Sequence, residues 1–449
     1  MKTLEQIAAE LQGYDPQAMT ADGVLDFLSR LATPVQDMLE VPLMQALGRV
    51  LAADVVSPFD VPPHDNSAMD GYAFAGVQLT PGAALKLQVV GTALAGRAWQ
   101  GSVQPGQCVG IMTGAVMPAG LDTVVPQEFV ALQKTGQTEA IVIPQGLLQT
   151  GDNRRLRGED LMQGRQALLK GELVTPARLG LAASLGLATL KVWRLLRVAY
   201  FSTGDEILSL GDSPREGAVY DSNRNTVFGM LSRLGCEVID MGVVGDDPAQ
   251  LEAAFTQAAA QADAIITSGG VSVGEADYTR AMMKKLGDVA FWRIAMRPGR
   301  PMAVGRISGI KSASSAHPSS AESYLNDSNH VNHALLFGLP GNPVAVMVTF
   351  LAFVRPALLQ MMGARPEPDV LLKAHSTHAI RKKSGRTEYQ RGRVTTGSDG
   401  SLHVATTGNQ GSGVLSSMAE ANGLIVLHHA QGNVAVGDAV DVLMFGGVS

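Results

Sequence analysis

The sequence predicts an α/β multidomain protein: a parallel-sheet α/β domain, an inserted small β domain, a helical and mixed linker domain and a C-terminal β domain. The first observation is length, because 449 residues are roughly three times the usual domain size of about 150. The second is a central region in which apolar strand-like runs alternate with helical segments, as in a parallel sheet covered on both faces. The third is that short strand-like runs between Gly and Pro turns lie on both sides of this region.

The first part of the chain is predicted to be a helical domain that a β domain interrupts. Residues 20–51 have a helical texture, and residues 175–186 are predicted to form a helix that stops at a glycine. The residues between these segments are dense in Val, Gly and Pro, with strand-like runs at 85–90 and 140–143. We therefore predict a discontinuous linker domain and an inserted β domain, with bounds 1–53 plus 155–190 and 54–154.

The central region is predicted to form the α/β domain at residues 191–363, followed by the C-terminal β domain at residues 364–449. Residues 308–333 are rich in Ser, Asn and His and have no period, so we expect a surface loop between two strands; a partner-binding loop is the alternative. Strands are expected at 197–201, 236–244, 262–267 and 335–339, and helices at 224–234, after Asp247-Pro248 and after Asn342-Pro343.

Composition narrows the class of protein. With 46% hydrophobic and 17% charged residues the chain can form packed cores and is not a disordered polymer. A net charge of -6 argues against a broad nucleic-acid surface. Two cysteines, Cys108 and Cys236, cannot build a disulfide framework, and no run reaches about 18 uninterrupted apolar residues. We expect a cytoplasmic protein with neither nucleic-acid nor membrane partners.

Three loops at predicted strand ends are candidate ligand sites, because ligands of open parallel sheets bind outside the carboxyl ends of the strands. Their glycines allow backbone N–H groups to approach a phosphate, and a helix beginning after Asn342 favours an anion. A tight structural connection is the alternative for each loop. The candidate phosphate-binding residues are Ser202, Thr203, Gly204, Ser268, Gly269, Gly270, Ser272, Gly274, Pro340, Gly341 and Asn342.

Carboxylates in or beside these loops are candidate Mg²⁺ ligands, because oxygen-only ligand sets suit Mg²⁺ better than zinc. Asp246 and Asp277 are the preferred pair, with Glu206 as a third. Asp221 and Asp247 are also nearby, but their positions before predicted helices favour roles as caps and turn formers.

Arginines form a second candidate site. Arg293, Arg297 and Arg300 are closely spaced around a turn that prolines rigidify, with Pro301 directly after it. Guanidinium forks match the oxygens of phosphate or another tetrahedral oxyanion, so the turn predicts an anion site. A further basic segment, residues 381–391, is interpreted from its pattern alone as a solvated face.

Taken in order, the motifs resemble the molybdopterin molybdenumtransferase family, which includes bacterial MoeA and the gephyrin E domain. The resemblance extends over nearly the whole chain. The matching segments are 63–73 (PHDNSAMDGYA), 113–115, 118–125, 157–160, 202–206, 220–223, 268–274, 297–301 and 339–343.

The resemblance implies a homodimer whose active cleft lies between the α/β domain, molybdopterin-binding-like in this family, and the partner's inserted β domain. It implies Mg²⁺-dependent insertion of molybdate into adenylylated molybdopterin with release of AMP, and possible handover to other cofactor-biosynthesis proteins. The catalytic residues implied by motif are Asp70, Thr113, Asp160, Glu206, Asp246 and Asp277. The implied molybdate-binding residues are Arg293, Arg297, Arg300 and Pro301, with Arg386 or Arg391 and Ser412 or Ser416.

This chain departs from the family pattern at several positions. Arg293, Arg297 and Arg300 stand where relatives commonly have Lys, which replaces a compact ammonium by a planar fork. Ala345 stands where a Ser is common, and the 308–333 loop is longer than expected. Two alternatives from other classes are an adenylyltransferase for the preceding step and a non-catalytic scaffold.

Overall fold

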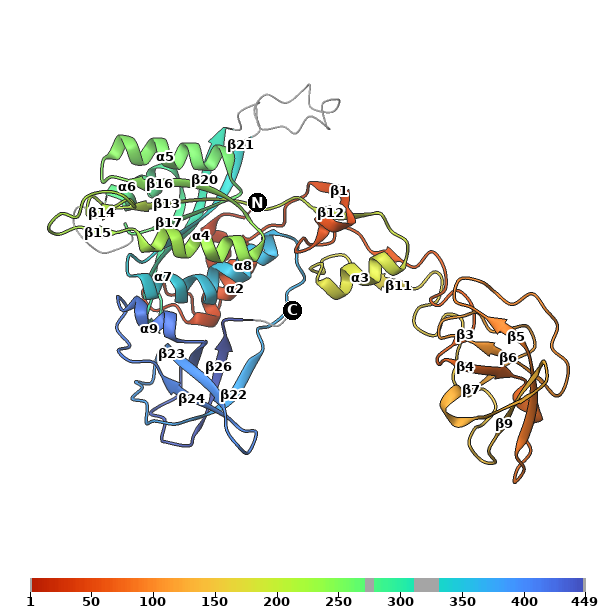
Figure 1. The fold of residues 1–449 in the computed structure, drawn as a ribbon. Helices are drawn as coiled ribbons and strands as arrows, with labels where there is room; N and C mark the ends of the chain where they lie inside the picture. Colours follow the sequence, from red (N-terminus) through yellow and green to blue (C-terminus); the bar gives the residue numbers. More distant parts are fainter. Residues whose placement is uncertain (1, 271–277, 311–330, 447–449) are drawn as a thin grey trace, which may run out of the picture. The chain divides into compact units, whose positions relative to one another are not determined.

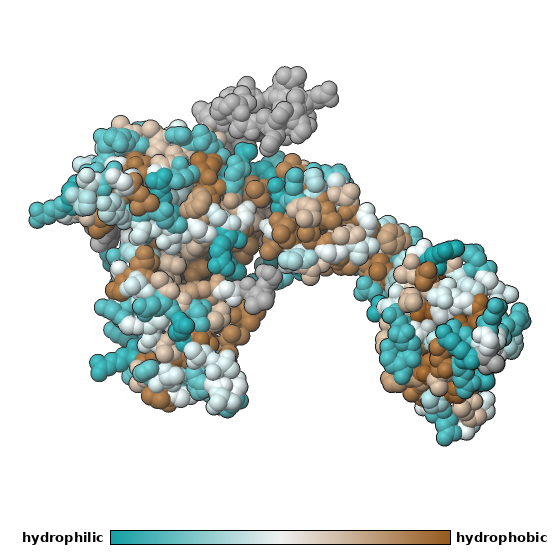
Figure 2. All heavy atoms as spheres, in the orientation of Figure 1, coloured by the Kyte–Doolittle hydropathy of each residue, from teal (hydrophilic) through white to brown (hydrophobic). Residues whose placement is uncertain are grey.

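The computed structural model describes residues 2–270, 278–310 and 331–446, and the chain forms two compact units (Figure 1). One unit comprises Met1–Ala52, Gly171–Pro176 and Thr189–Ser449, and the other comprises Ala53–Lys170 and Ala177–Ala188. Hydrophilic and hydrophobic side chains are interspersed over the visible surface of each unit (Figure 2).

A six-stranded sheet forms the centre of the first unit, with strand order β16-β13-β17-β21-β20-β18. The strands β16, β13, β17 and β21 are parallel to one another, whereas β20 is antiparallel to both β21 and β18. The predicted parallel sheet is therefore confirmed for these four strands, and the antiparallel strand β20, with β18 beyond it, extends the sheet at one edge. The bounds are β13 (Arg197–Thr203), β16 (Glu237–Val244), β17 (Ala264–Ser268), β18 (Gly287–Arg293), β20 (Pro301–Ile310) and β21 (Val331–Leu339).

Helices cover both faces of this sheet, which explains why its strands are apolar almost without alternation. Within β13, Val198 and Tyr200 pack into one core cluster, while Ala199 and Phe201 pack into the other. The first cluster includes residues of α2, α4 and α7, and the second includes residues of α5 and α6. The helix bounds are α1 (Leu4–Glu10), α2 (Ala21–Leu31), α4 (Ser222–Leu234), α5 (Pro248–Gln261), α6 (Tyr278–Leu286), α7 (Pro343–Thr349), the π-helix η6 (Phe350–Val354) and α8 (Arg355–Met361).

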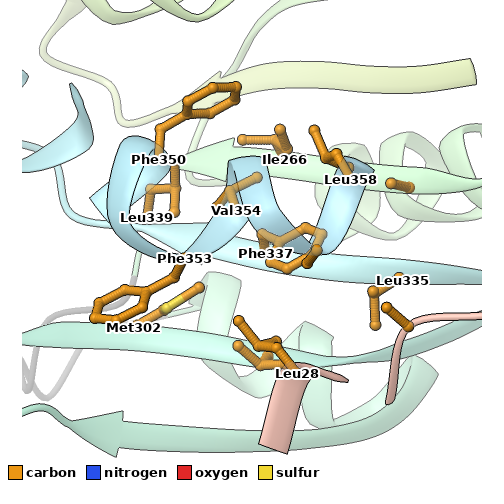
Figure 3. Close-up of a cluster of buried hydrophobic side chains, with 14 of the residues drawn as sticks. Leu28, Ile266, Met302, Leu335, Phe337, Leu339, Phe350, Phe353, Val354 and Leu358 are labelled. Carbon is orange, nitrogen blue, oxygen red and sulfur yellow. The ribbon is translucent and has the colours of Figure 1, made fainter. Parts of the chain in front are cut away.

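One continuous helical stretch, Pro343–Met361, is long and apolar enough to cross a membrane by length and composition alone. Its side chains Phe350, Phe353, Val354 and Leu358 belong to the larger core cluster, where they meet residues of the sheet (Figure 3). The hydropathy of this stretch is therefore accounted for by its place in the core.

The prediction of a loop at residues 308–333 is wrong at both ends, where the residues lie in strands. Ser308, Gly309 and Ile310 continue β20 and pair with β21 back to Val331. Backbone pairing does not require an apolar pattern, so the polar sequence at these strand ends gave no indication of strand structure. Residues 311–330 lie outside the described part of the chain.

The C-terminal part of the first unit is a small barrel-like sheet. Its order is β19-β23-β24-β22-β26-β25, and an additional β23–β25 pairing closes the ring, which leaves its five main strands without a free edge. Alternate side chains such as Val404, Ile425, Val440 and Val442 fill the interior. The bounds are β19 (Met296–Arg297), β22 (Leu371–Ser376), β23 (Thr387–Thr396), β24 (Leu402–Thr406), α9 (Leu415–Glu420), β25 (Gly423–Leu427) and β26 (Ala439–Met444).

The helical structure predicted for residues 20–51 is found only in its first part, in α2. Beyond α2 the chain forms β1 (Met38–Pro42), which pairs antiparallel with β12 (Thr189–Trp193), and then the short 3₁₀ helix η1 (Leu43–Ala46). The partner strand lies about 150 residues further along, so local periodicity could not reveal this pairing.

The second unit contains the β-rich segment. Its six-stranded sheet has the order β7-β4-β6-β5-β9-β8, in which β5 and β6 are parallel and the other pairs antiparallel. The bounds are β2 (Val55–Val56), β3 (Asn66–Ser67), β4 (Gly71–Phe74), η2 (Gly76–Gln78), β5 (Leu85–Ala93), β6 (Gln107–Ile111), β7 (Thr123–Pro126), η3 (Gln127–Phe129), β8 (Ala131–Thr135), β9 (Thr138–Ile143), β10 (Arg154–Arg155), β11 (Gln166–Leu168) and α3 (Pro176–Ser184).

Candidate active site

Buried hydroxyl groups connect the carboxyl ends of β13 and β17. The Tyr200 hydroxyl lies 2.9 Å from Ser202 Oγ and 2.7 Å from Ser268 Oγ, and the two serine oxygens are 3.1 Å apart. All three side chains are almost fully buried, and burial raises the pKa of Tyr200 well above its ordinary value. The hydroxyls are therefore neutral and can bond in a closed ring that fixes both strand ends. Sequence reasoning named the two serines and missed Tyr200.

The glycines that follow these strands are required by the backbone. Gly269 has φ +93°, and a Cβ at this position would lie 2.6 Å from the Thr203 carbonyl oxygen. Gly204 has φ +134°, and a Cβ there would collide with the Glu206 carboxylate. Both loops thus need glycine for conformation and for space. Gly270 is the last residue described in its loop, and Ser272, Gly274 and Asp277 lie outside the described residues.

The loop after β21 meets two other segments at the start of α7. Asn342 occupies the predicted N-cap position and Pro343 the first helical turn, although the Asn342 side chain makes no capping hydrogen bond. Asn223 Nδ2 donates to the Gly341 carbonyl at 2.7 Å, and the Val344 amide donates to the Ser412 carbonyl at 3.1 Å. Ser412 is thereby held beside this helix start. Pro340, which precedes Gly341, is buried.

Three carboxylates gather beside the end of β13. The Asp246 amide donates to Asp205 Oδ1 at 3.0 Å. Burial raises the pKa of Asp246, and the nearby Asp205 and Glu206 carboxylates raise it further. Negative charges are thus crowded enough to disfavour ionisation, and a cation would relieve this crowding. Asp205 was not among the predicted site residues, although it stands beside Glu206 in the sequence.

The donor chemistry of this acidic cluster, Asp205, Glu206 and Asp246, fits Mg²⁺, which prefers carboxylate oxygens. Within residues 2–270, 278–310 and 331–446, no three Asp, Glu, His or Cys side chains are close enough together to hold a metal ion by themselves. Asp221 and Asp247 are helix N-caps, as the cap interpretation predicted: they accept from the amides of Arg224 and Gln250, each at 2.9 Å. Asp277, the remaining predicted ligand, is not among the described residues.

The arginine turn is attached to the barrel. Met296 and Arg297 form β19, which pairs parallel with β23 so that Arg297 stands beside Glu388. A small pocket opens to solvent here, with Arg297, Glu388, Arg391 and Gln410 among its lining residues. Arg293, Arg297 and Arg300 are exposed, and Arg293 and Pro301 are register partners in β18 and β20. The predicted anion turn therefore borders a pocket with a second arginine, which sequence spacing could not bring together.

Arg391 is buried and binds the loop that precedes α9. Its guanidinium donates to the carbonyls of Asn409, Gln410 and Gly411 at 2.9–3.2 Å, and to Ser417 Oγ at 3.0 Å. Burial lowers the pKa of Arg391, and the charge of Arg297 lowers it further.

The interpretation of residues 381–391 as a solvated face is wrong for Arg391, which is 1% exposed, and for Lys382, which is 6% exposed. The loop at residues 409–411 and Ser417 of α9 cover Arg391, and a charge pattern alone carries no information about such a tertiary contact. Lys382 instead donates to the His428 and His429 carbonyls at 2.6 and 3.2 Å. Ser416, the alternative to Ser412, is exposed on α9.

Two predicted catalytic residues of the second unit are bonded to each other. Asp70 Oδ1 accepts from the Thr113 amide at 2.6 Å and from the Thr113 hydroxyl at 2.8 Å. These two bonds lower the pKa of Asp70, so its carboxylate is ionised at neutral pH. Asp160 is exposed in a separate loop, where its amide donates to the Val61 carbonyl at 3.1 Å.

Comparison with known proteins covers most of the chain. Three family models match successive segments: "MoeA N-terminal region (domain I and II)" at residues 19–186, "Probable molybdopterin binding domain" at 199–360, and "MoeA C-terminal region (domain IV)" at 373–445.

Curated relatives match over nearly their whole length. The molybdopterin molybdenumtransferase of Haemophilus influenzae is 39% identical over 419 residues, which are 93% of this chain and 96% of that protein. The protein of the same name from a Nostoc species is 35% identical over 437 residues, which are 94% and 92% of the two chains. The crystal structure of a molybdopterin biosynthesis MoeA protein from Pyrococcus horikoshii, 28% identical, matches with a TM-score of 0.69 over 96% of this chain and 100% of that one. The chain belongs to the molybdopterin molybdenumtransferase (MoeA) family.

Proposed function

We propose that this protein is a molybdopterin molybdenumtransferase, which inserts molybdate into adenylylated molybdopterin and releases AMP. The observation that carries the proposal is one continuous path of contacts in the first unit. It runs from the acidic cluster through the glycine loops to the start of α7, and from there to Arg391 and Arg297.

The first half of this path suits the phosphates of the substrate. Thr203 and Gly204 adjoin Glu206, and Gly269 adjoins both Thr203 and Gly341. Backbone at the half-buried Gly270 and the exposed Gly341 would bind the pyrophosphate. Gly204 is buried and Gly269 donates its amide to the Leu339 carbonyl, so these two would shape the loops, with Ser202 and Ser268 fixing them from beneath. Ser272, Gly274 and Pro340 belong to the same loops and are proposed for the same role.

The acidic cluster would hold Mg²⁺ together with Asp277. Bound there, Mg²⁺ would supply Lewis-acid stabilisation of charge at the pyrophosphate that is cleaved. The support for this assignment is that Asp246 is bonded to Asp205 through its amide, and that its pKa is raised first by burial and then by the charges of Asp205 and Glu206. Asp205 is added here to the ligands that the sequence suggested.

The second half of the path suits a tetrahedral oxyanion. Arg297, Arg300 and Pro301 would bind molybdate from the turn, with Arg293 at its base. Arg386 is the better candidate than Arg391, because Arg391 already donates to three carbonyls and one hydroxyl. Ser412 is the better candidate than Ser416, because its backbone is bonded at the start of α7.

Asp70, Thr113 and Asp160 complete the proposal. They would act from the β-rich unit of a second copy in a homodimer, where the ionised Asp70 would orient the substrate or a water. We also propose that the protein works in the cytoplasm and can hand its product to other cofactor-biosynthesis proteins.

The test is AMP release from adenylylated molybdopterin by the purified protein with molybdate and Mg²⁺. We expect AMP formation that requires both ions, and an Asp277→Ala variant that folds normally but has almost no turnover. Wild-type turnover in that variant would remove Asp277 from the site. Synthesis of the adenylylated compound from ATP would identify the adenylyltransferase instead, and inactivity with intact substrate binding would identify a scaffold.

A further inference from the structure

A buried carboxylate, that of Glu388, lines the small pocket that Arg297 and Arg391 also line. Glu388 is 1% exposed, and its Oε1 accepts a hydrogen bond from Arg386 Nε at 2.8 Å and forms an ion pair with Arg386 Nη2 at 2.6 Å. Its Oε2 accepts from Gln390 Nε2 at 3.2 Å. Glu388 also stands beside Arg297 in the β19–β23 ladder. Of the residues described around this pocket, it is the one carboxylate in the lining.

We propose that Glu388 is a positioning residue that holds Arg386 for the oxyanion. The inference rests on the proposed function, because it assigns Arg386 to molybdate. Glu388 binds the Nε and Nη2 edge of the guanidinium. In the described part of the chain, Nη1 has no hydrogen-bond partner and is the group left for a ligand oxygen.

Charge alone argues against a glutamate at this place. A carboxylate close to an anion site repels the anion, most strongly where burial reduces screening by water. Its presence therefore needs a reason that outweighs this repulsion. A planar guanidinium loses much of its advantage over an ammonium unless its orientation is fixed, and a carboxylate held on one edge fixes that orientation.

The neighbouring residues keep Glu388 directed at Arg386. Arg391 directs its guanidinium to the loop of Asn409, Gln410 and Gly411, and Lys382 directs its ammonium to the turn at His428 and His429. Neither makes an ion pair with Glu388. Burial lowers the pKa of Lys382 and of Arg391, because it removes both charged groups from water. Their hydrogen bonds to backbone carbonyls compensate for part of this loss.

The test measures binding of molybdate alone by equilibrium dialysis, using the full chain without nucleotide. E388Q keeps the size of the side chain and removes a negative charge. If Glu388 were only a nearby charge, E388Q would bind molybdate more tightly than the wild type. We expect about tenfold weaker binding, the size of effect that loss of a charged hydrogen bond produces.

The same substitution in an R386A variant distinguishes a positioning role of Glu388 from a general structural role. In R386A, where there is no guanidinium to hold, E388Q should no longer weaken binding and should instead leave it unchanged or tighten it. If E388Q weakens molybdate binding only when Arg386 is present, Glu388 acts through Arg386. Glu237→Gln, which removes an exposed glutamate on β16, is the matched control and should bind as the wild type does.

Each outcome decides between the two proposals. Molybdate binding by E388Q that equals or exceeds wild-type binding overturns the positioning role and leaves the proposed function standing. Failure of the wild type to bind molybdate counts against the proposed function itself. If E388Q does not fold, E388D replaces it: this variant keeps the charge but shortens the reach, so unchanged affinity in E388D would also overturn the inference.

Discussion

The amide and the hydroxyl of Thr113 converge on a single oxygen of Asp70, at 2.6 Å and 2.8 Å. The two residues are 43 positions apart in the sequence, and the fold of the β-rich unit brings them together. Both bonds stabilise the ionised carboxylate and so lower its pKa. This arrangement fixes the direction of a charged group on an exposed surface, as the proposed role of Asp70 requires.

Thr113→Val removes the hydroxyl donor and keeps the shape of the side chain. We expect the pKa of Asp70 to rise toward its ordinary value while the carboxylate stays ionised at pH 7. Turnover should fall about tenfold, because one of two orienting bonds is lost. The acid limb of the pH–rate profile should also move to higher pH. Thr80→Val, at an exposed loop position, is the control, and equal turnover in the two variants would contradict the role of Thr113.

Tyr200→Phe opens the hydroxyl ring beneath the phosphate loops. Ser202 and Ser268 remain within 3.1 Å of each other, so the loss should be about 1 kcal/mol of unfolding free energy. The KM for the adenylylated substrate should rise more than kcat falls, because the loops that bind phosphate are less fixed. Urea unfolding and steady-state kinetics measure both effects. Tyr220→Phe, which removes an exposed hydroxyl bonded to the Asp212 carbonyl, should change KM little.

The sequence was informative where function and local structure coincide. The strand-end rule placed Ser202, Ser268 and Gly269 at one edge of the sheet, and the structure connects them there. Both helix caps, Asp221 and Asp247, followed from their positions before helices.

Other features depend on tertiary closure, which no local pattern contains. In the sequence Arg391 has the pattern of a surface cation, but the loop at residues 409–411 and Ser417 of α9 surround its guanidinium and bury it. In the sequence, Tyr200 lies in an apolar strand pattern that does not indicate a hydrogen-bond partner. Its partner Ser268 lies on the neighbouring strand. β20 was not among the strands expected from the sequence, and its antiparallel direction is set by how the chain returns to the sheet.

Asp246→Asn tests the acidic cluster without substrate. Removing one of three crowded charges should raise the thermal unfolding temperature in the absence of Mg²⁺, because the repulsion that raises the pKa of Asp246 disappears. Adding Mg²⁺ should stabilise the wild type and have much less effect on the variant. A wild type that Mg²⁺ does not stabilise, together with a variant that unfolds at a lower temperature, would contradict the assignment. Asp399→Asn, on the barrel, is the control and should keep the wild-type response to Mg²⁺.

Asp441 gives the barrel a predictable dependence on pH. Its Oδ1 lies 2.8 Å from Lys373 Nζ, and its Oδ2 lies 2.7 Å from His428 Nε2. Burial alone would raise the pKa of Asp441, but the hydrogen bonds from Lys373 and His428 outweigh it and lower the pKa. A carboxylate whose pKa is lowered by folding stabilises the folded state above its ordinary pKa. That stabilisation is lost as the pH falls through the lowered value.

Asp441→Asn should therefore lower the unfolding free energy at pH 7, by about 1 kcal/mol or less because the ion pairs are partly exposed. The difference between variant and wild type should shrink below about pH 4, where the unfolded carboxyl takes up its proton. Urea unfolding at a series of pH values measures it. A difference that persists undiminished at pH 2 would mean that Asp441 stabilises the barrel by packing rather than by its charge.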